Sequence, residues 1–236
     1  MATEAAVTAR DVSKSFLMGR QKVPALKGVS LGVAAGTMTA LIGPSGSGKS
    51  TLLHLIAGLE SVDSGELSVL GRPVHTSGQA ELAALRLREI GFVYQDFSLI
   101  SDLTLIENVR LPLEGAGIAR KQAHAAAGEA MARVGLSGLE DRFPAEVSGG
   151  QQQRASIARA IVGERKLVLA DEPTGSLDSK TGIEIMEILA GLRDEGVTVV
   201  LSTHNPANLA YADETAELSD GSLVSLTERS SAGERS

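Results

Sequence analysis

The sequence predicts an α/β fold in which helices cover both faces of a mostly parallel sheet. Short apolar runs alternate with helical segments along most of the chain, as expected for strands that are buried on both faces. A glycine-rich loop at 43–51 follows one apolar run and leads directly into a helix. A helical, alanine-rich stretch from about 97 to 161 interrupts the alternation, which resumes after it. This stretch is therefore predicted to be an insertion into the α/β core.

The first third of the chain is predicted to be rich in strands. Gly, Pro and Ser turns separate four short apolar or alternating runs, which are Val7–Val12, Val29–Val33, Met38–Ile42 and Leu67–Leu70. A helix is predicted over Ala80–Arg88, because Leu82, Leu85 and Arg86 recur at helical spacing. Gly91–Tyr94 is expected to form a further short strand.

The rest of the chain continues with helices and buried strands. Helix is predicted for most of Leu103–Phe143, with interruptions at Pro112 and at 115–117, and a further helix begins just after Gly149-Gly150. The later elements are a strand at Leu167–Ala170, a helix at Lys180–Arg193, a strand at Val197–Leu201 and a hairpin over Leu218–Leu226 around Asp220-Gly221. Residues 228–236 are polar and are predicted to be a disordered tail, which leaves 1–227 as the folded domain.

The composition limits the class of protein. The chain has 236 residues, of which 43% are hydrophobic and 22% charged, as is ordinary for a soluble globular protein. It has no Cys, which excludes disulfides and thiol chemistry, and its net charge of −7 argues against a nucleic-acid partner. No apolar run approaches the roughly 18 residues that span a bilayer, and the first residues lack a signal-peptide pattern. A membrane role is therefore expected only through a partner.

The most specific motif lies at 43–51, where every fixed position of G-x-x-x-x-G-K-[ST] is matched. Its residues are Gly43, Pro44, Ser45, Gly46, Ser47, Gly48, Lys49, Ser50 and Thr51. Glycines allow backbone N–H groups to face an anion, and the start of the following helix adds partial positive charge. We therefore predict that Lys49 reaches the outer phosphates of a nucleotide and that the Ser50 hydroxyl ligates Mg²⁺.

Two acids follow the apolar strand Leu167–Ala170. Ligand groups in open α/β sheets gather at the carboxyl ends of strands, so Asp171 is predicted to lie beside Ser50 and to hold the metal. The next side chain along a strand points elsewhere, and Glu172 is predicted to be the general base that polarises the attacking water. The alternative is an ordinary strand end with solvated acids, which the phosphate loop upstream disfavours.

A second helix start with anion-binding character lies at 148–151. Ser148 is placed as an N-cap, Gly149 and Gly150 free the backbone, and a helix follows. The chain thus has two predicted phosphate-binding helix starts about a hundred residues apart. The alternative is that Ser148-Gly149-Gly150 only caps a helix.

With these motifs, residues 6–226 resemble the nucleotide-binding subunit of an ABC transporter. Gly43–Thr51 resembles its Walker A loop and Leu167–Glu172 its Walker B strand with the catalytic glutamate. The family signature is matched by Ser148, Gly149, Gly150 and Gln151, with Val147 where Leu is usual. The resemblance implies an α/β P-loop NTPase (RecA-like) core with an antiparallel β subdomain and an inserted α-helical signature subdomain. It also implies ATP and Mg²⁺ as cofactors, and ATPase activity.

Further residues match family motifs in the expected order. Gln95 falls at the Q-loop position that contacts Mg²⁺ and water, Asp178 lies in a D-loop, and His204 matches the switch histidine at the γ-phosphate. Phe16 is similar to the aromatic residue that stacks on adenine, where Tyr is more usual. Taken singly, these residues have ordinary alternatives: a solvated Gln, a packed His and a core Phe. Order and spacing together favour the family roles.

The resemblance implies that two copies, or this chain and a homologous ATPase subunit, pack head-to-tail around two ATP molecules. Each ATP would lie between one Walker A loop and the partner's signature helix, so Ser148 and Gly150 would meet the γ-phosphate in trans. This arrangement gives a reason for two anion sites in one chain.

Finer features resemble the group that includes LolD, MacB and FtsE. The segments concerned are Val23–Leu31, Ile90–Gln95, Leu103-Thr104, Glu107–Val109, Leu111–Leu113 and Leu169–Gly175. The group implies an integral membrane permease as partner, a place on the cytoplasmic face of the membrane, and export or envelope handling of a lipoprotein, peptide or drug. One alternative is a soluble ABC ATPase that acts on DNA or ribosomes, although this acidic chain lacks a long coiled coil or a second cassette. Another is a regulator without hydrolysis, which Glu172 and His204 oppose.

The permease is expected to dock in a groove between the core and the helical insertion. The segment Tyr94–Leu105 is apolar for a loop beside a polar site, and Phe97, Leu99 and Ile100 are candidates for its exposed surface. The alternative is that these side chains pack inside the insertion.

Overall fold

The computed structural model describes residues 5–229. Its strands are β1 (Ala5–Met18), β2 (Gln21–Ala34), β3 (Met38–Ile42), β4 (Ser64–Val69), β5 (Arg72–Pro73), β6 (Ile90–Val93), β7 (Leu167–Asp171), β8 (Thr198–Ser202), β9 (Glu214–Ser219) and β10 (Ser222–Glu228). Its α-helices are α1 (Lys49–Ile56), α2 (Gln79–Arg88), α3 (Leu105–Gly115), α4 (Arg120–Arg133), α5 (Gly149–Ile161) and α6 (Ser179–Asp194), with 3₁₀ turns at Pro144–Glu146 and Pro206–Tyr211.

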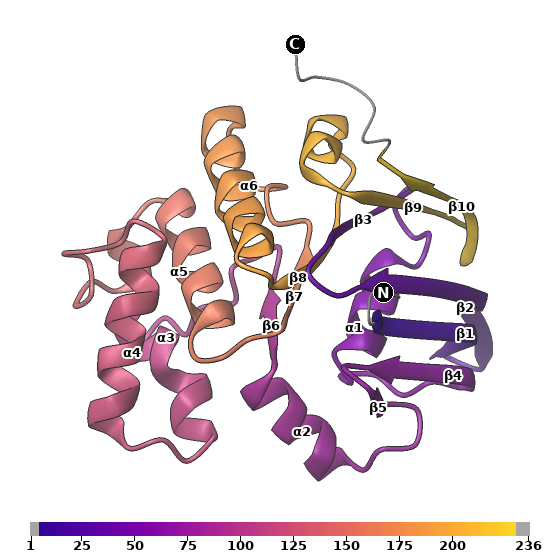
Figure 1. Ribbon diagram of the computed structural model, residues 1–236, viewed down its shortest axis with the longest axis horizontal. Coiled ribbons are helices and arrows are strands. Elements are labelled where there is room, and N and C mark those ends of the chain that lie inside the picture. The colour runs from indigo at the N-terminus through magenta and orange to yellow at the C-terminus, as the bar shows by residue number, and fades with distance from the viewer. Residues whose placement is uncertain (1–4, 230–236) are drawn as a thin grey trace.

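The strands form two sheets (Figure 1). One sheet is antiparallel, with the order β2-β1-β4-β5, and the other has the order β10-β9-β3-β8-β7-β6. In the second sheet, β9, β3, β8, β7 and β6 run parallel and only β10 is antiparallel. The register pairs Leu41 with Ser202 and Asp171 with Ser202, so the carboxyl ends of β3, β8 and β7 lie side by side. The candidate site lies at this edge of the sheet.

The parallel sheet is buried on both faces because alternate side chains of its strands enter two different cores. In β7, Val168 and Ala170 belong to a core with the helices α3, α4, α5 and α6, whereas Leu167 and Leu169 belong to a core with α1 and the antiparallel sheet. All four side chains are fully buried. The predicted α/β class with a doubly covered sheet is therefore observed, and Figure 1 shows α3, α4 and α5 grouped on the side opposite the antiparallel sheet. The boundaries of the inserted subdomain, at about 97 and 161, stay a prediction.

Three local predictions need correction. Helix α3 continues through Pro112 to Gly115, because the loss of one backbone donor is outweighed by packing of its buried face against the helical core. Residues 134–143 form turns instead of helix, with Gly135 and Gly138 at positive φ. The chain is also ordered further than expected, since β10 includes Glu228 and the Arg229 N–H donates to the Asp213 carbonyl at 2.7 Å. The rest of the predicted tail, 230–236, lies outside the described residues.

The predicted closing hairpin is observed. Strands β9 and β10 turn at Asp220 and Gly221, which have φ values of 49° and 82°, as a tight two-residue hairpin requires. Within 5–229, no helix is both long enough and apolar enough to cross a bilayer.

Candidate active site

The phosphate-binding loop joins β3 to α1, and Lys49 is the first residue of that helix. The Lys49 side chain is buried, and its Nζ donates to the carbonyl oxygens of Gly43 at 2.8 Å and Pro44 at 3.0 Å. The ammonium group is therefore held against the loop. Inside the same loop the Ser47 hydroxyl is buried and has no hydrogen-bond partner among the described residues. A buried donor without a partner is costly.

The loop is fixed by the last hairpin of the chain. The Gly221 N–H donates to the Ser47 carbonyl at 3.1 Å, and the Lys27 N–H donates to the Gly221 carbonyl at 2.7 Å. Gly43 has a φ of 139°, and a Cβ there would lie 2.0 Å from the Leu218 carbonyl oxygen, so the backbones approach too closely for any side chain. The loop conformation is thus determined by tertiary contacts as well as by its own glycines.

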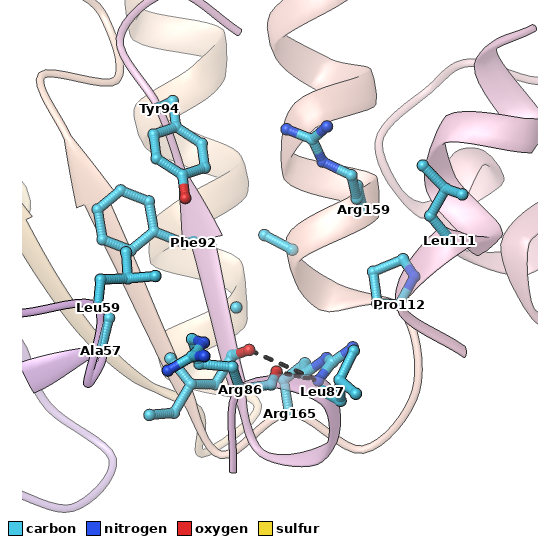
Figure 2. A pocket seen from close by; sticks show the side chains of 13 residues that line it. Ala57, Leu59, Arg86, Leu87, Phe92, Tyr94, Leu111, Pro112, Arg159 and Arg165 are labelled. Atoms are coloured by element: carbon cyan, nitrogen blue, oxygen red, sulfur yellow. Dashed lines mark hydrogen bonds between the residues drawn. The ribbon is translucent and has the colours of Figure 1, made fainter. Parts of the chain in front are cut away.

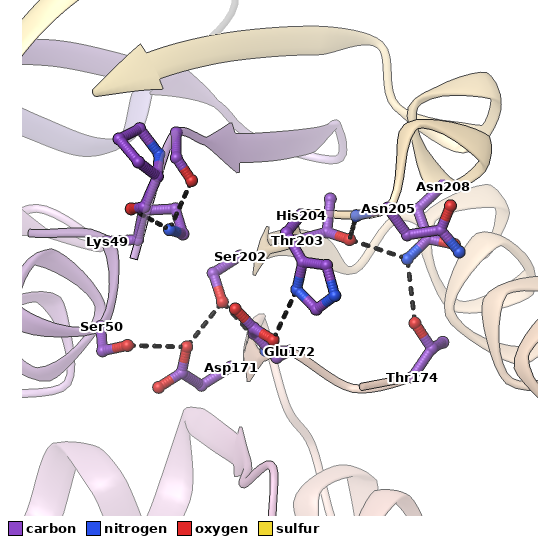
Figure 3. A network of polar contacts seen from close by, with 12 residues as sticks. Lys49, Ser50, Asp171, Glu172, Thr174, Ser202, Thr203, His204, Asn205 and Asn208 are labelled. Atoms are coloured by element: carbon purple, nitrogen blue, oxygen red, sulfur yellow. Dashed lines mark hydrogen bonds and ion pairs between the residues drawn. The ribbon is translucent and has the colours of Figure 1, made fainter. Parts of the chain in front are cut away.

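Asp171 and Ser50 are adjacent, as the strand-end argument predicts (Figure 3). The Ser50 hydroxyl donates to Asp171 Oδ1 at 3.0 Å. The Ser202 hydroxyl donates to the same oxygen at 2.6 Å and accepts the Glu172 N–H at 2.9 Å. Ser202 is fully buried at the end of β8. It therefore holds both acids from the neighbouring strand.

Glu172 contacts His204. His204 Nδ1 lies 2.8 Å from Glu172 Oε2, and the histidine side chain is largely exposed. Glu172 has a φ of 44°, an uncommon backbone conformation for a residue with a side chain. Glu172 Oε2 and Gln95 Nε2 lie 3.2 Å and 3.5 Å from the point where a Cβ on Gly175 would be, so both side chains reach the loop that follows β7. The carboxylate is thus oriented by an imidazole beside an open cavity lined by Thr174, Thr203 and neighbouring residues.

Two residues of this network are missing from the sequence predictions. Ser202 ends an apolar strand directly across from Asp171, and a polar residue at such a place is the signal that could have identified it. The buried Asn208 links two loops, because its Nδ2 donates to Thr174 Oγ1 at 3.0 Å and to Thr203 Oγ1 at 2.9 Å (Figure 3). Nothing in the local sequence marks Asn208, since its partners are about 34 and 5 residues away.

The second predicted helix start is built as a capping box. The Gln151 N–H donates to Ser148 Oγ at 3.3 Å, and the Ser148 N–H donates to Gln151 Oε1 at 2.9 Å. Gly150 lies against the start of α6, because a Cβ there would come within 2.5 Å of Thr181 Cγ2. Gly149 lies near Phe97 and Leu177. In Figure 1, α5 belongs to the group of helices on one side and α1 to the other side, so the two helix starts are apart within one chain.

Asp178 is the N-cap of α6 and makes no hydrogen bond to the residues that hold Asp171 and Glu172. Its carboxylate accepts the N–H groups of Lys180 and Thr181 at 3.1 Å each, and the Thr181 hydroxyl at 2.6 Å. The Thr181 side-chain hydrogen bond, followed by these backbone bonds, lowers the pKa of Asp178 below its ordinary value. Asp178 is exposed beside the signature segment.

Two predicted site residues are not joined to the cluster in the described residues. Gln95 makes no hydrogen bond to Ser50 or Asp171 there, although it reaches the loop that carries Glu172. Phe16 is near the end of β1, in the antiparallel sheet, and is 38% exposed. Lys14 Nζ lies over its ring, 5.2 Å from the ring centroid.

A cleft is present where the permease is predicted to dock, and the docking itself stays a prediction. Most of the residues proposed for the docking surface do not line this cleft. A cleft lies between the sheet and the helical group, and of the segment 94–105 only Tyr94 lines it (Figure 2). Leu99 packs against the helical core, and Phe97 lies near Gly149. Ile100 is 48% exposed but outside the cleft. For Leu99 the alternative prediction, packing inside the helical insertion, is therefore correct. Burial of an apolar side chain against the neighbouring helices is favourable.

Comparison with known proteins agrees with this geometry. The profile of the ABC transporter family matches residues 26–175, more than half of the chain. The chain belongs to the ABC transporter family. It is 45% identical over 215 residues to the macrolide export ATP-binding/permease protein MacB of Escherichia coli (strain K12). It is 47% identical over 214 residues to MacB of Salmonella typhimurium (strain LT2). These matches cover 91% of this chain but only 33% of each relative, so the chain spans about a third of the length of these curated relatives.

Solved ABC cassettes share the fold. The dimeric bacterial cassette MJ0796 aligns with a TM-score of 0.88 and 37% identity, covering 94% of this chain and 98% of that one. The same cassette, as a post-hydrolysis dimer bound to ADP and phosphate, aligns with a TM-score of 0.88 and 36% identity over the same shares of both chains. CbiO1 from Clostridium perfringens aligns with a TM-score of 0.83 and 27% identity, covering 95% and 89% of the two chains. The predictions of an ABC ATPase cassette and of its fold are confirmed, whereas the roles of individual residues stay predictions.

Proposed function

We propose that this cassette binds and hydrolyses Mg·ATP in a head-to-tail dimer and thereby drives a partner membrane permease in export or envelope handling. The observation that carries the proposal is the convergence of Ser50, Asp171, Glu172 and His204 at the carboxyl edge of one parallel sheet. The named relatives combine an ATP-binding part with a permease part, and this chain corresponds in length to about a third of them. The permease is proposed to hold the chain at the cytoplasmic face of the membrane.

The phosphate loop would bind the nucleotide through groups that contact the loop itself in this structure. Lys49 Nζ contacts only two loop carbonyls among the described residues, and phosphate oxygens would be stronger partners for a buried cation. Phe16, with its exposed ring, is the proposed platform for adenine.

The residues present fit Mg²⁺. Ser50 Oγ and Asp171 Oδ1 are hard oxygen donors 3.0 Å apart, and Mg²⁺ prefers oxygen ligands while keeping phosphates and water in its shell. Within 5–229, no cluster of three or more His, Cys, Asp or Glu side chains could hold a metal ion. Ser50 and Asp171 would hold it, with Gln95 as a further ligand, and the ion would neutralise phosphate charge.

Hydrolysis is assigned to Glu172 and His204. The Glu172 carboxylate would orient the attacking water and accept its proton, which is the role of a positioned base. His204, 2.8 Å from Glu172 Oε2, would fix that carboxylate and contact the γ-phosphate. Ser202 holds the Glu172 backbone N–H, so the base is positioned at both its backbone and its side chain.

The signature helix is assigned to the neighbouring copy's ATP. In one chain, α5 and α1 lie in different parts of the molecule, so we assign Ser148, Gly149, Gly150 and Gln151 to a second copy's phosphates. The start of α5 offers N–H groups and partial positive charge for this contact. Asp178, exposed beside the signature, would also lie at this interface.

A substitution at Glu172 tests the proposal. Glu172→Gln removes the base but keeps the side-chain shape, so Mg·ATP binding should persist while phosphate release falls by about 10²–10⁴-fold. The ATP-bound dimer should then accumulate, as measured by light scattering during size-exclusion chromatography. The matched control is Glu187→Gln, an exposed glutamate on α6, which should hydrolyse ATP at the wild-type rate. Normal turnover by a monomeric Glu172→Gln variant would contradict the assignment.

A further inference from the structure

The segment that follows Glu172 is held by two buried amide side chains. Gln153, in α5, is fully buried, and its Nε2 donates to the Pro173 carbonyl at 2.7 Å. Asn208, in the 3₁₀ turn after β8, is also buried, and its Nδ2 donates to Thr174 Oγ1 at 3.0 Å (Figure 3). Two successive residues after the proposed base are therefore fixed from two different elements.

The backbone of Glu172 needs such support. Its φ of 44° lies in the left-handed region, which a residue with a side chain occupies only at a cost in free energy. A conformation of this kind persists where the surrounding contacts determine it. The Ser202 hydroxyl accepts the Glu172 N–H at 2.9 Å, and the Gln153 amide binds the carbonyl of the next residue. Hydrogen bonds therefore fix the chain on both sides of the strained residue.

Asn208 also fixes the loop that carries His204. The same Nδ2 donates to Thr203 Oγ1 at 2.9 Å, and Thr203 directly precedes His204. One amide thus joins the residue before His204 to the segment after Glu172. Because Glu172 Oε2 lies 2.8 Å from His204 Nδ1, a change in the distance between the two loops would change this contact directly.

Stability alone does not explain a glutamine at position 153. A proline carbonyl can only accept a hydrogen bond, so the donor end of the Gln153 amide faces Pro173. The other end, Gln153 Oε1, is buried and has no hydrogen-bond partner among the described residues. A buried acceptor without a partner is costly, and an apolar side chain of the same size would not carry that cost. The amide is therefore expected to serve the segment that it holds.

We propose that Gln153 and Asn208 are positioning residues for hydrolysis, which hold the segment after Glu172 so that its carboxylate stays in place beside His204. The inference rests on the proposed function, in which Glu172 is the base. Within 5–229, neither amide makes a hydrogen bond to the phosphate loop at 43–51. Nucleotide affinity should therefore be independent of both amides, whereas turnover should depend on them. The alternative is that the amides only stabilise the fold.

The test measures hydrolysis and binding on the same purified full-chain variants. Gln153→Met and Asn208→Leu keep a side chain of similar volume and remove the donors. We expect kcat for ATP hydrolysis to fall about 10–100-fold in each, because a small displacement of a catalytic group slows the chemical step strongly. The Kd of ATP, measured by calorimetry, should stay within about twofold of wild type, as expected for a loss confined to the transition state.

Two further positions separate positioning from stability. Thr174→Val is isosteric and removes the acceptor of the Asn208 bond, so it should lower kcat in the same way, whereas Thr174→Ser keeps a hydroxyl and should recover most of the loss. The matched control is Asn108→Leu, because Asn108 is a fully buried amide that donates to the carbonyls of Ile100 at 3.0 Å and Leu103 at 3.1 Å, away from Glu172. This control should unfold at lower urea concentration than wild type but keep the kcat of the folded chain.

The results distinguish this inference from the proposed function. A wild-type chain that hydrolyses no Mg·ATP would overturn the proposed function itself. If wild type hydrolyses ATP and either Gln153→Met or Asn208→Leu has the wild-type kcat, only the positioning role is contradicted. An equal fall of kcat in Asn108→Leu would also contradict it, because the loss would then follow from removing any buried amide. So would a loss of ATP affinity that matches the loss of kcat.

Discussion

Replacing Ser202 by Ala tests the arrangement that positions both acids. Ser202 is fully buried, its hydroxyl donates to Asp171 Oδ1 at 2.6 Å, and it accepts the Glu172 N–H at 2.9 Å. The substitution removes a hydrogen bond to a charged group, worth about 1.5–3 kcal/mol, and leaves a partly buried N–H without its partner, which costs about 1–3 kcal/mol. Because the two effects overlap and water can reach part of the site, we expect a loss of about 2–4 kcal/mol in the free energy of unfolding.

Urea unfolding of the full chain measures this loss, and thermal unfolding should show a fall of about 5–15 °C, since about 1 kcal/mol shifts the midpoint of a chain of this size by about 2–4 °C. Asp171 also loses a fixed partner, so half-maximal ATP hydrolysis should need more Mg²⁺. The matched control is Ser156→Ala: Ser156 is equally buried, but its hydroxyl has no partner among the described residues. That change should be neutral or slightly stabilising.

The result that would refute this reasoning is a Ser202→Ala variant within about 0.5 kcal/mol of wild type. Equal losses in the free energy of unfolding for Ser202→Ala and Ser156→Ala would also refute it. They would show that burial alone, and not the hydrogen bonds, determines the loss of stability.

Three further predictions concern nucleotide and dimer. Lys49→Ala removes the cation of the loop, so calorimetry should show sharply weaker ATP binding while the chain stays folded in the absence of nucleotide. Unchanged affinity would exclude this site. Ser148→Arg puts a bulky cation against the partner's phosphates, so hydrolysis should stop while the monomer still binds ATP. Mixing Ser148→Arg subunits with Lys49→Ala subunits should restore some activity, because one of the two sites in a mixed dimer carries neither defect. Raising salt from about 50 to 500 mM should speed association of ATP-bound Glu172→Gln subunits, because it screens repulsion between acidic copies; slower association in stopped-flow light scattering would show that long-range attraction dominates.

Much of the site could be predicted because its polar side chains lie at the carboxyl ends of buried strands. The Leu167–Ala170 run is continuously apolar and the Met38–Ile42 run is apolar except for Thr39, and such strands are buried in a parallel sheet whose carboxyl ends meet at one edge. That reasoning places Asp171 beside Ser50 without any knowledge of the register, and the hydrogen bond at 3.0 Å agrees with it.

Contacts between distant segments could not be predicted in the same way. Asn208 joins Thr174 and Thr203 across 34 and 5 residues, and no local pattern encodes such a bridge. The apolar character of Leu99 indicates an exposed docking surface, with a buried contact as the alternative, and its packing against the helical core shows that the alternative holds. Pro112 was expected to interrupt α3, but local propensity is a weak preference that the buried face of the helix overrides.

The charge of the chain gives a physical reason for nucleotide control of the proposed dimer. Each copy has a net charge of −7, and bound ATP adds further negative charge, so two copies repel each other at long range. Closure must therefore be stabilised at short range, where the N–H groups at the start of α5 meet phosphate. Screening acts weakly over such buried contacts and strongly over the surface charges. Removal of the γ-phosphate would take away the short-range attraction and leave the repulsion, so the same charge that slows closure would favour opening after hydrolysis.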